Sequence, residues 1–162
     1  CFGGAFMSLC NCDIVITDEE ATYGLSEINW GIIPAGLVSK VFADNVSMRE
    51  CLFYAMTGRT FDGREAVSMK IANIAGPADK LREETVTIAR ELMEKNPVAL
   101  AFTKQAMRNV KTMDAPQAYE YLMTKIQALM FADPEKTRNR GIEEFIDKKT
   151  YRPGLEPVKR PE

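Results

Sequence analysis

The chain has 162 residues, no histidine and a formal net charge of −2, with 46% hydrophobic and 27% charged residues. This balance is typical of one globular domain, or most of one, and without a basic excess the chain is not expected to bind nucleic acid. The lack of histidine excludes Ser-His-Asp and Cys-His nucleophile schemes within this chain. No apolar run approaches the roughly 18 residues of a membrane span, so we expect no membrane partner.

Short elements are predicted before Gly36. The run 5–12, which follows the pair Gly3-Gly4, could be helical. "CDIVIT" (12–17) predicts a buried strand, and "ATYGL" (21–25) predicts a possible second strand.

Helices dominate the prediction after Gly36. "SMRE" (47–50) and "DGRE" (62–65) resemble capping boxes, so each predicts a helix start. Gly58 can end the first of these helices, and "IANIAG" (71–76) predicts a short strand. Two or three short strands do not make a stable sheet, so we expect either a fragment or a sheet completed elsewhere.

Four further helices are predicted in the second half. Their starts follow Pro77, Asn96-Pro97, Asp114 and Pro134. The second of them is expected to end near Thr112. The Pro-rich tail from 150 to 162 is predicted to be extended or mobile.

The four cysteines, Cys1, Cys10, Cys12 and Cys51, do not have metal-ligand spacing, and no histidine completes a site. We therefore expect no metal. Buried free thiols in a reducing, cytoplasmic compartment are the expected state.

Two features of the opening stretch carry chemistry. Gly3-Gly4 allow a ligand to approach the backbone, and the N–H groups at a helix start suit an anionic oxygen, although the pair also fits a plain tight turn. Glu27, in "YGLSEINWGII", is either an exposed loop residue or a partly desolvated carboxylate suited to acid–base work. In the second case Trp30 and the neighbouring isoleucines are expected to desolvate it, and Trp30 is otherwise expected in the core.

The stretch "GGAF…CDIVITDEEATYGLSEINWGIIPAG" resembles the signature of the crotonase (enoyl-CoA hydratase/isomerase) superfamily. "MTGRTFDGREAVSMKIANIAG" and "ELMEKNPVALAFTKQAM" resemble its later motifs, in the same order. Within the superfamily, "GLSEINWGI" and "NPVAL" are most similar to hydroxycinnamoyl-CoA (feruloyl-CoA) hydratase-lyases. The resemblance covers essentially the whole chain.

The resemblance implies an α/β (α+β) fold, a ββα spiral of which this chain holds mostly the final strands and the C-terminal helical trimerisation region. It implies three segments: 1–76 ends the spiral core and holds the acid–base site, 77–149 is the helical region, and 150–162 is the extended tail. The first part of such a domain, with most of the spiral, is not in this chain.

The resemblance also implies roles for individual residues. The Gly4 N–H is one donor of an oxyanion hole whose second donor lies in the absent part, and Gly3 lies against the substrate. Glu27 is the acid–base group. Ser26 orients Glu27 or the water, or bonds only to nearby backbone. Trp30 lines the substrate, or belongs to the core.

Departures from the family pattern affect the substrate site. Met7 occupies the place of a second glutamate in ordinary hydratases and of a serine in hydratase-lyases. Ala35 replaces a glycine whose N–H holds the water. Met123 replaces a tyrosine that binds the phenol oxygen of a neighbouring subunit's substrate, and Tyr119, one turn earlier, could reach that oxygen or belong to the core.

Coenzyme A and assembly involve the C-terminal part. Phe145 and Lys149, with Lys148 and Lys159, could contact the CoA moiety, or the lysines could be solvated helix-end charges. The superfamily forms trimers or hexamers through its C-terminal helices. The apolar positions Leu122, Ile126, Leu129 and Met130 suit such an interface and suit an internal core equally.

The implied function is hydration of a 4-hydroxycinnamoyl-CoA double bond and retro-aldol cleavage to an aromatic aldehyde and acetyl-CoA, with the acyl-CoA thioester as substrate and no cofactor. Two alternatives stay open: a general enoyl-CoA hydratase or isomerase, and an inactive crotonase-like assembly module.

Overall fold

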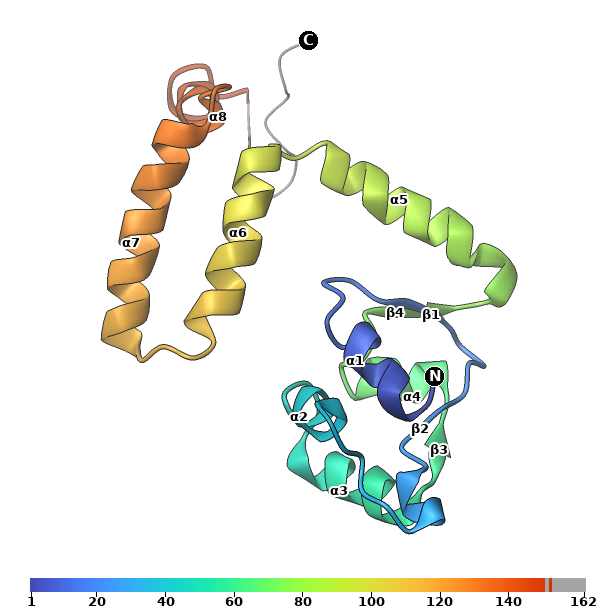
Figure 1. Ribbon diagram of the computed structural model, residues 1–162. Helices are drawn as coiled ribbons and strands as arrows, with labels where there is room; N and C mark the ends of the chain where they lie inside the picture. Colours follow the sequence, from blue (N-terminus) through green and yellow to red (C-terminus); the bar gives the residue numbers. More distant parts are fainter. Residues whose placement is uncertain (151, 153–162) are drawn as a thin grey trace. The chain divides into compact units, whose positions relative to one another are not determined.

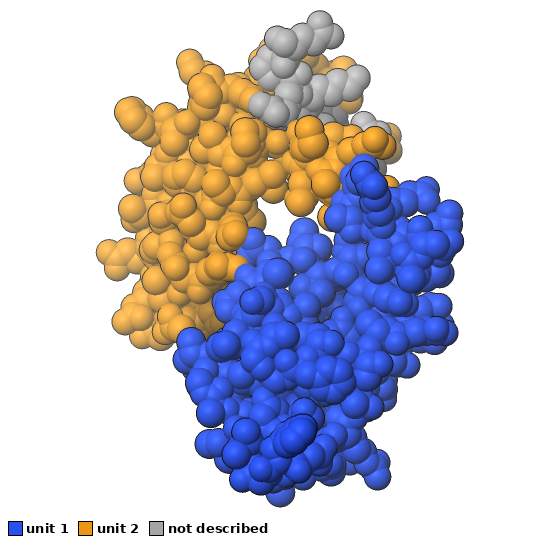
Figure 2. All heavy atoms as spheres, turned by 45° about the vertical axis from the view of Figure 1, so that its right-hand side comes forward, with its two compact units in different colours: residues 1–86 blue, residues 87–162 orange. Residues whose placement is uncertain are grey.

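The computed structural model describes residues 1–150 and 152. Its short strands all lie before Pro77, and the elements that follow in the described residues are helical (Figure 1). The chain divides into two compact units, Cys1–Val86 and Thr87–Glu162, shown in blue and orange in Figure 2. The boundary falls inside helix α5 (Leu81–Met93). The predicted tail lies almost wholly outside the described residues, and the predicted three-segment division stays a prediction.

Two pairs of short strands form the sheet structure of the first unit. β1 (Ile16–Asp18) lies parallel to β4 (Ile74–Gly76). β2 (Tyr23–Gly24) lies antiparallel to β3 (Thr60–Phe61). The strands predicted at 21–25 and 71–76 are confirmed as shorter elements, and the strand predicted at 12–17 is found shifted to 16–18. β3 was not predicted from the sequence.

The helices of the first unit begin at local capping residues. Asp62 and Glu65 form the predicted capping box, in which each side chain accepts a hydrogen bond from the other residue's backbone N–H, at 2.8 and 2.9 Å. At the start of α3, the Ser47 hydroxyl accepts a hydrogen bond from Glu50 N–H. The Glu50 carboxylate accepts from the Ser47 hydroxyl and not from the Ser47 backbone, so the predicted capping box is only half formed. Gly58 ends α3 with φ = 64°, as predicted. The helical elements are η1 (Gly3–Ala5), α1 (Phe6–Leu9), η2 (Glu27–Trp30), α2 (Val38–Ala43), α3 (Met48–Thr57), α4 (Gly63–Ser68) and η3 (Ala78–Lys80).

Aromatic side chains form the core of the first unit. Phe6 from α1 meets Phe42 from α2 edge to face, with ring centroids 5.2 Å apart. Tyr23 and Phe61 stack across the β2–β3 pair at 5.4 Å. Burial of each such side chain stabilises the fold by roughly 1.5–3 kcal/mol. This core therefore fixes α1 and β2, the elements that flank the candidate site.

The second unit is built on a helical hairpin. α6 (Pro97–Val110) and α7 (Ala115–Ala132) run side by side, followed by α8 (Thr137–Ile142) and the π-helical turn η4 (Glu143–Asp147), as Figure 1 shows. The helix starts predicted at Asn96-Pro97 and Asp114 are confirmed. The Asn96 and Asp114 side chains cap these helices by accepting hydrogen bonds from the backbone N–H groups of Ala99 and Gln117.

A buried polar cluster joins the start of α6 to the turn before α8. The Asn96 amide donates to Asp133 Oδ1 at 2.9 Å and to Thr137 Oγ1 at 2.8 Å, and the Asp133 carboxylate also accepts from the N–H groups of Glu135 and Thr137. Because Asp133 organises this turn, α8 begins at Thr137 and not at the predicted Pro134.

Among residues 1–150 and 152, no helix is long and apolar enough to cross a membrane.

Candidate active site

The first residues of the chain lie alongside the strand that leads to Glu27. Phe2 forms a parallel bridge with Gly24, and Gly24 N–H donates to Cys1 C=O at 3.1 Å. A Cβ on Gly24 would lie 2.9 Å from a ring carbon of Phe2, so only glycine admits this pairing. Gly3 follows Phe2 directly and Glu27 lies three residues after Gly24, so the bridge brings two segments distant in sequence to one place.

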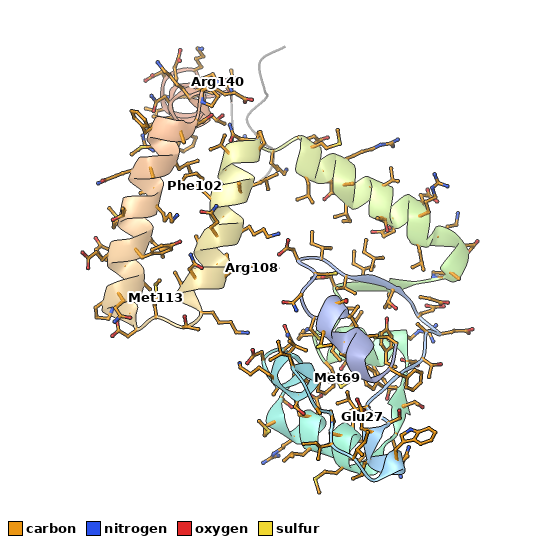
Figure 3. All side chains as sticks on the ribbon, in the orientation of Figure 1. Glu27, Met69, Phe102, Arg108, Met113 and Arg140 are labelled. Atoms are coloured by element: carbon orange, nitrogen blue, oxygen red, sulfur yellow. The ribbon has the colours of Figure 1, made fainter. Side chains whose placement is uncertain are left out.

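The Glu27 carboxylate packs on the backbone of Gly3. Gly3 has φ = 48°, and a Cβ built there would lie only 2.8 Å from Glu27 Oε1. The other oxygen, Oε2, is buried and has no hydrogen-bond partner among residues 1–150 and 152. A buried, unpaired carboxylate oxygen is costly and calls for a functional explanation. This oxygen can accept a hydrogen bond or a proton from water or from the substrate. Figure 3 labels Glu27 among the elements of the first unit.

Gly4 and Met7 complete this group. The first hydrogen bond of the helical run is donated by Ala5 N–H to Phe2 C=O at 3.1 Å, so the N–H groups of Gly3 and Gly4 precede it. The Met7 methyl lies 3.9 Å from the position of a Cβ on Gly4. The structure therefore brings Gly3, Gly4, Met7 and Glu27 together.

The apolar cover predicted for Glu27 is wrong within the described residues. Trp30 is 79% exposed, so it does not belong to the core and does not bury the carboxylate, and Ile28 is also exposed. The η2 turn leaves these side chains exposed, and the Glu27 carboxylate instead packs against Gly3. Ser26 is half-buried and precedes η2 without capping it by its side chain, and Ala35 is exposed.

The remaining predicted site residues belong to the second unit. Tyr119 and Met123 lie one turn apart on α7 and are both exposed, with Tyr119 at 69%, so the expectation that Tyr119 belongs to the core is wrong. Phe145 is exposed on η4, and Lys149 is exposed with φ = 54°. Lys148 pairs with Glu143 at 2.9 Å. Lys159 lies outside the described residues.

An apolar groove of about 260 Å³ runs between α6 and α7. Leu122, Ile126 and Leu129 contribute to it, while Met130 is also largely exposed. The remaining lining residues are Phe102, Thr103, Ala106 and Lys125. The ammonium group of Lys125 lies 5.4 Å from the ring centres of both Phe102 and Tyr121. Because apolar positions on α7 are exposed, the predicted subunit interface stays a prediction.

The cysteines are free, but not all are buried as predicted. Cys51 is buried and Cys10 half-buried, whereas Cys1 and Cys12 are exposed because they lie at the chain end and in the turn after α1. Burial, and secondly the neighbouring Cys12, raises the pKa of the Cys10 thiol, which disfavours the reactive thiolate.

One contact near Glu27 could not be predicted from the sequence. The Asn29 side chain lies directly on Gly58, at the end of α3. Gly58 is recognisable as a helix terminator, but nothing in the local pattern indicates that it also receives a side chain from 29 positions earlier.

The chain matches the enoyl-CoA hydratase/isomerase family over residues 1–152. It is 45% identical over 160 residues to hydroxycinnamoyl-CoA hydratase-lyase from Pseudomonas fluorescens, an alignment covering 99% of this chain and 58% of that protein. It is 27% identical over 139 residues to 2,3-dehydroadipyl-CoA hydratase from Escherichia coli (strain K12), covering 86% of this chain and 53% of that protein.

Among solved structures, an enoyl-CoA hydratase from Mycobacterium smegmatis superposes with a TM-score of 0.83 at 20% identity, covering 99% of this chain and 57% of that one. This likeness confirms the predicted mixed α/β, crotonase-like fold class. The chain spans somewhat more than half the length of these relatives. With a family match over nearly all its residues, the chain belongs to the enoyl-CoA hydratase/isomerase (crotonase) family.

Proposed function

We propose that this chain contributes the acid–base site of a CoA-thioester hydratase-lyase. The substrate is a 4-hydroxycinnamoyl thioester such as feruloyl-CoA, and the products are an aromatic aldehyde (vanillin from feruloyl-CoA) and acetyl-CoA. The observation that carries the proposal is the Glu27 carboxylate, held against Gly3 beside Gly4 with one buried oxygen unpaired. The similarity to a protein named hydroxycinnamoyl-CoA hydratase-lyase supports the substrate class.

In the hydration step, Glu27 accepts a proton from water while the water oxygen attacks the β-carbon. The electron pair of the double bond moves onto the thioester oxygen, and the Gly4 N–H stabilises the developing negative charge. Glu27 then returns the proton toward the α-carbon, so one carboxylate serves as both base and acid.

In the cleavage step, Glu27 removes the proton of the new β-hydroxyl group. The bond between the α- and β-carbons breaks, the aldehyde leaves, and the electron pair forms the enolate of acetyl-CoA. The Gly4 N–H stabilises this enolate until Glu27 delivers the proton it removed to the enolate carbon, which yields acetyl-CoA and regenerates the carboxylate.

Met7 supports a mechanism with one carboxylate, because its thioether neither holds nor transfers a proton. Its methyl group adjoins Gly4, where it offers an apolar surface to the thioester. Ser26, directly before Glu27, orients the carboxylate or the water, and the Ala35 N–H holds the water. Trp30 forms part of the substrate wall in the complete protein.

Residues of the second unit complete the proposal. Tyr119 and Met123 contact the aromatic end of a substrate, and Phe145 and Lys149 contact coenzyme A. The enzyme acts without a further cofactor, as a trimer or hexamer, in the cytoplasm. Exposed apolar residues on α7 support an assembly of this kind.

A general enoyl-CoA hydratase or isomerase is the second candidate. The similarity to a 2,3-dehydroadipyl-CoA hydratase supports it. Met7 and Met123, which depart from the hydratase-lyase pattern, fit a hydratase or isomerase with one catalytic glutamate equally well. An inactive assembly module is the third candidate, and it predicts that Glu27 has no chemical role.

The test uses the full-length protein with feruloyl-CoA and, separately, crotonyl-CoA, following thioester absorbance, vanillin and acetyl-CoA. We expect Glu27→Gln to lower aldehyde formation by about 10²- to 10⁴-fold, the usual contribution of a general acid–base group. Glu20→Gln is the matched control, since Glu20 is an exposed carboxylate seven positions earlier.

Turnover of crotonyl-CoA alone would favour the general hydratase. Undiminished aldehyde formation in Glu27→Gln would refute the assigned role of Glu27. A folded protein that turns over neither thioester would refute both enzyme assignments for these substrates.

A further inference from the structure

The turn that carries Glu27 is not held by burial of its own apolar side chains. Ile28 and Trp30, which share η2 with Glu27, are both exposed. Backbone hydrogen bonds within the turn hold its shape: the N–H groups of Gly31 and Ile32 both donate to the Glu27 carbonyl. These local bonds define the shape of η2, but they do not fix where the turn lies relative to Gly3.

Asn29 provides a contact from η2 to the rest of the unit. A Cβ built on Gly58 would lie 2.6 Å from Asn29 Oδ1, 2.7 Å from Nδ2 and 2.9 Å from Cγ. The whole amide group therefore lies flat against the Gly58 backbone, where only a hydrogen atom fits.

Gly58 is itself firmly placed. It ends α3 in the left-handed conformation, φ = 64°, and its N–H donates to Tyr54 C=O at 2.9 Å. The Tyr54 ring packs on Phe61 with centroids 4.8 Å apart, and Phe61 pairs with Tyr23 in β2, four residues before Glu27. The surface that receives Asn29 thus belongs to the same framework as the strand leading to the carboxylate.

We propose that Asn29 and Gly58 are positioning residues for Glu27, an inference that rests on the proposed acid–base role of Glu27. Moving the amide from 2.6 Å to an ordinary 3.4 Å contact would shift Asn29 by about 0.8 Å. All three contacting atoms belong to the exposed Asn29 side chain, and one of them is Cγ, next to Cβ. Because Glu27 lies two residues away on the same single turn, we infer that η2 moves with the displaced side chain and carries the carboxylate off Gly3.

The experiment compares Gly58→Ala, Asn29→Ala and the double variant in the full-length protein. Gly58→Ala is expected to lower kcat by about 10- to 100-fold, because displacements near 1 Å have effects of this size, and to leave KM within about 3-fold. Asn29→Ala loosens the turn, and we expect it to lower kcat by about 5-fold on the same grounds. The double variant should recover to the kcat of Asn29→Ala, since alanine at 29 removes the collision.

Backbone strain at position 58 is the same in Gly58→Ala and in the double variant, so their difference reports the side-chain contact alone. Gly36→Ala measures the strain by thermal unfolding, because Gly36 has φ = 65° and nothing within 4 Å of a Cβ. If Gly58→Ala does not fold, Asn29→Ala still tests the proposal without changing the glycine.

Wild-type kcat in Asn29→Ala, or a double variant as slow as Gly58→Ala, would overturn the positioning role. The experiment first establishes that the wild-type protein turns over the substrate and that Glu27→Gln loses this turnover. A failure of the proposed function is then distinct from a failure of this inference.

Discussion

Replacement of Gly3 by alanine tests the contact on which the candidate site is built. Gly3 has φ = 48°, a conformation that costs an L-residue about 1–2 kcal/mol. The new methyl group would also lie 2.8 Å from Glu27 Oε1. The substitution therefore affects both the stability of the first unit and the position of the carboxylate.

The expected displacement follows from the distance. An ordinary contact of 3.4 Å requires the carboxylate to retreat by at least 0.6 Å from the 2.8 Å position. Catalytic geometry tolerates about 0.5 Å, so we expect Gly3→Ala to lower kcat by about 10-fold or more. The free energy of unfolding should fall by about 1–2 kcal/mol through backbone strain.

The assay measures kcat with feruloyl-CoA together with thermal and urea unfolding. Gly36→Ala is the control for strain, since it has φ = 65° and open space around the added methyl group. A Gly3→Ala variant with wild-type kcat would refute the reasoning, because the carboxylate would then function without its place on Gly3. An equal loss of kcat in Gly36→Ala would show that strain, and not displacement, is the cause.

Two further predictions concern stability. Burial opposes ionisation of Asp133, but hydrogen bonds from Thr137, Asn96 and Glu135 outweigh it and hold the pKa of its carboxyl below the usual value. The resulting stabilisation is present above about pH 4, the unfolded value, and is lost as pH falls through the folded pKa. Urea unfolding between pH 2 and 6 should therefore depend less on pH in Asp133→Asn than in the wild type, and equal slopes would contradict this. Asp62→Ala removes the capping box of α4 and should lower the free energy of unfolding by about 1 kcal/mol. Asp62→Asn should retain most of the capping stabilisation. An unchanged urea midpoint in Asp62→Ala would contradict the capping role.

Most helix starts could be predicted from the amino-acid sequence, because a capping residue and its partner lie within three positions of each other. The Asp62–Glu65 box and the helix starts at Asn96-Pro97 and Asp114 were predicted, and all are present. The ordered family motifs likewise identified the fold class and selected Glu27 among the carboxylates. These signals are local, so they do not depend on the path of the rest of the chain.

The assembly of the candidate site depends on contacts between elements that are distant in the sequence. The pairing of Phe2 with Gly24 places Gly3 against Glu27, and Asn29 lies on Gly58, although each pair is separated by more than 20 positions. Trp30 was expected to shield Glu27, yet the η2 turn leaves it in solvent. Periodicity and capping fix directions only within one element, whereas contacts between elements follow from core packing and from the space that a glycine leaves open.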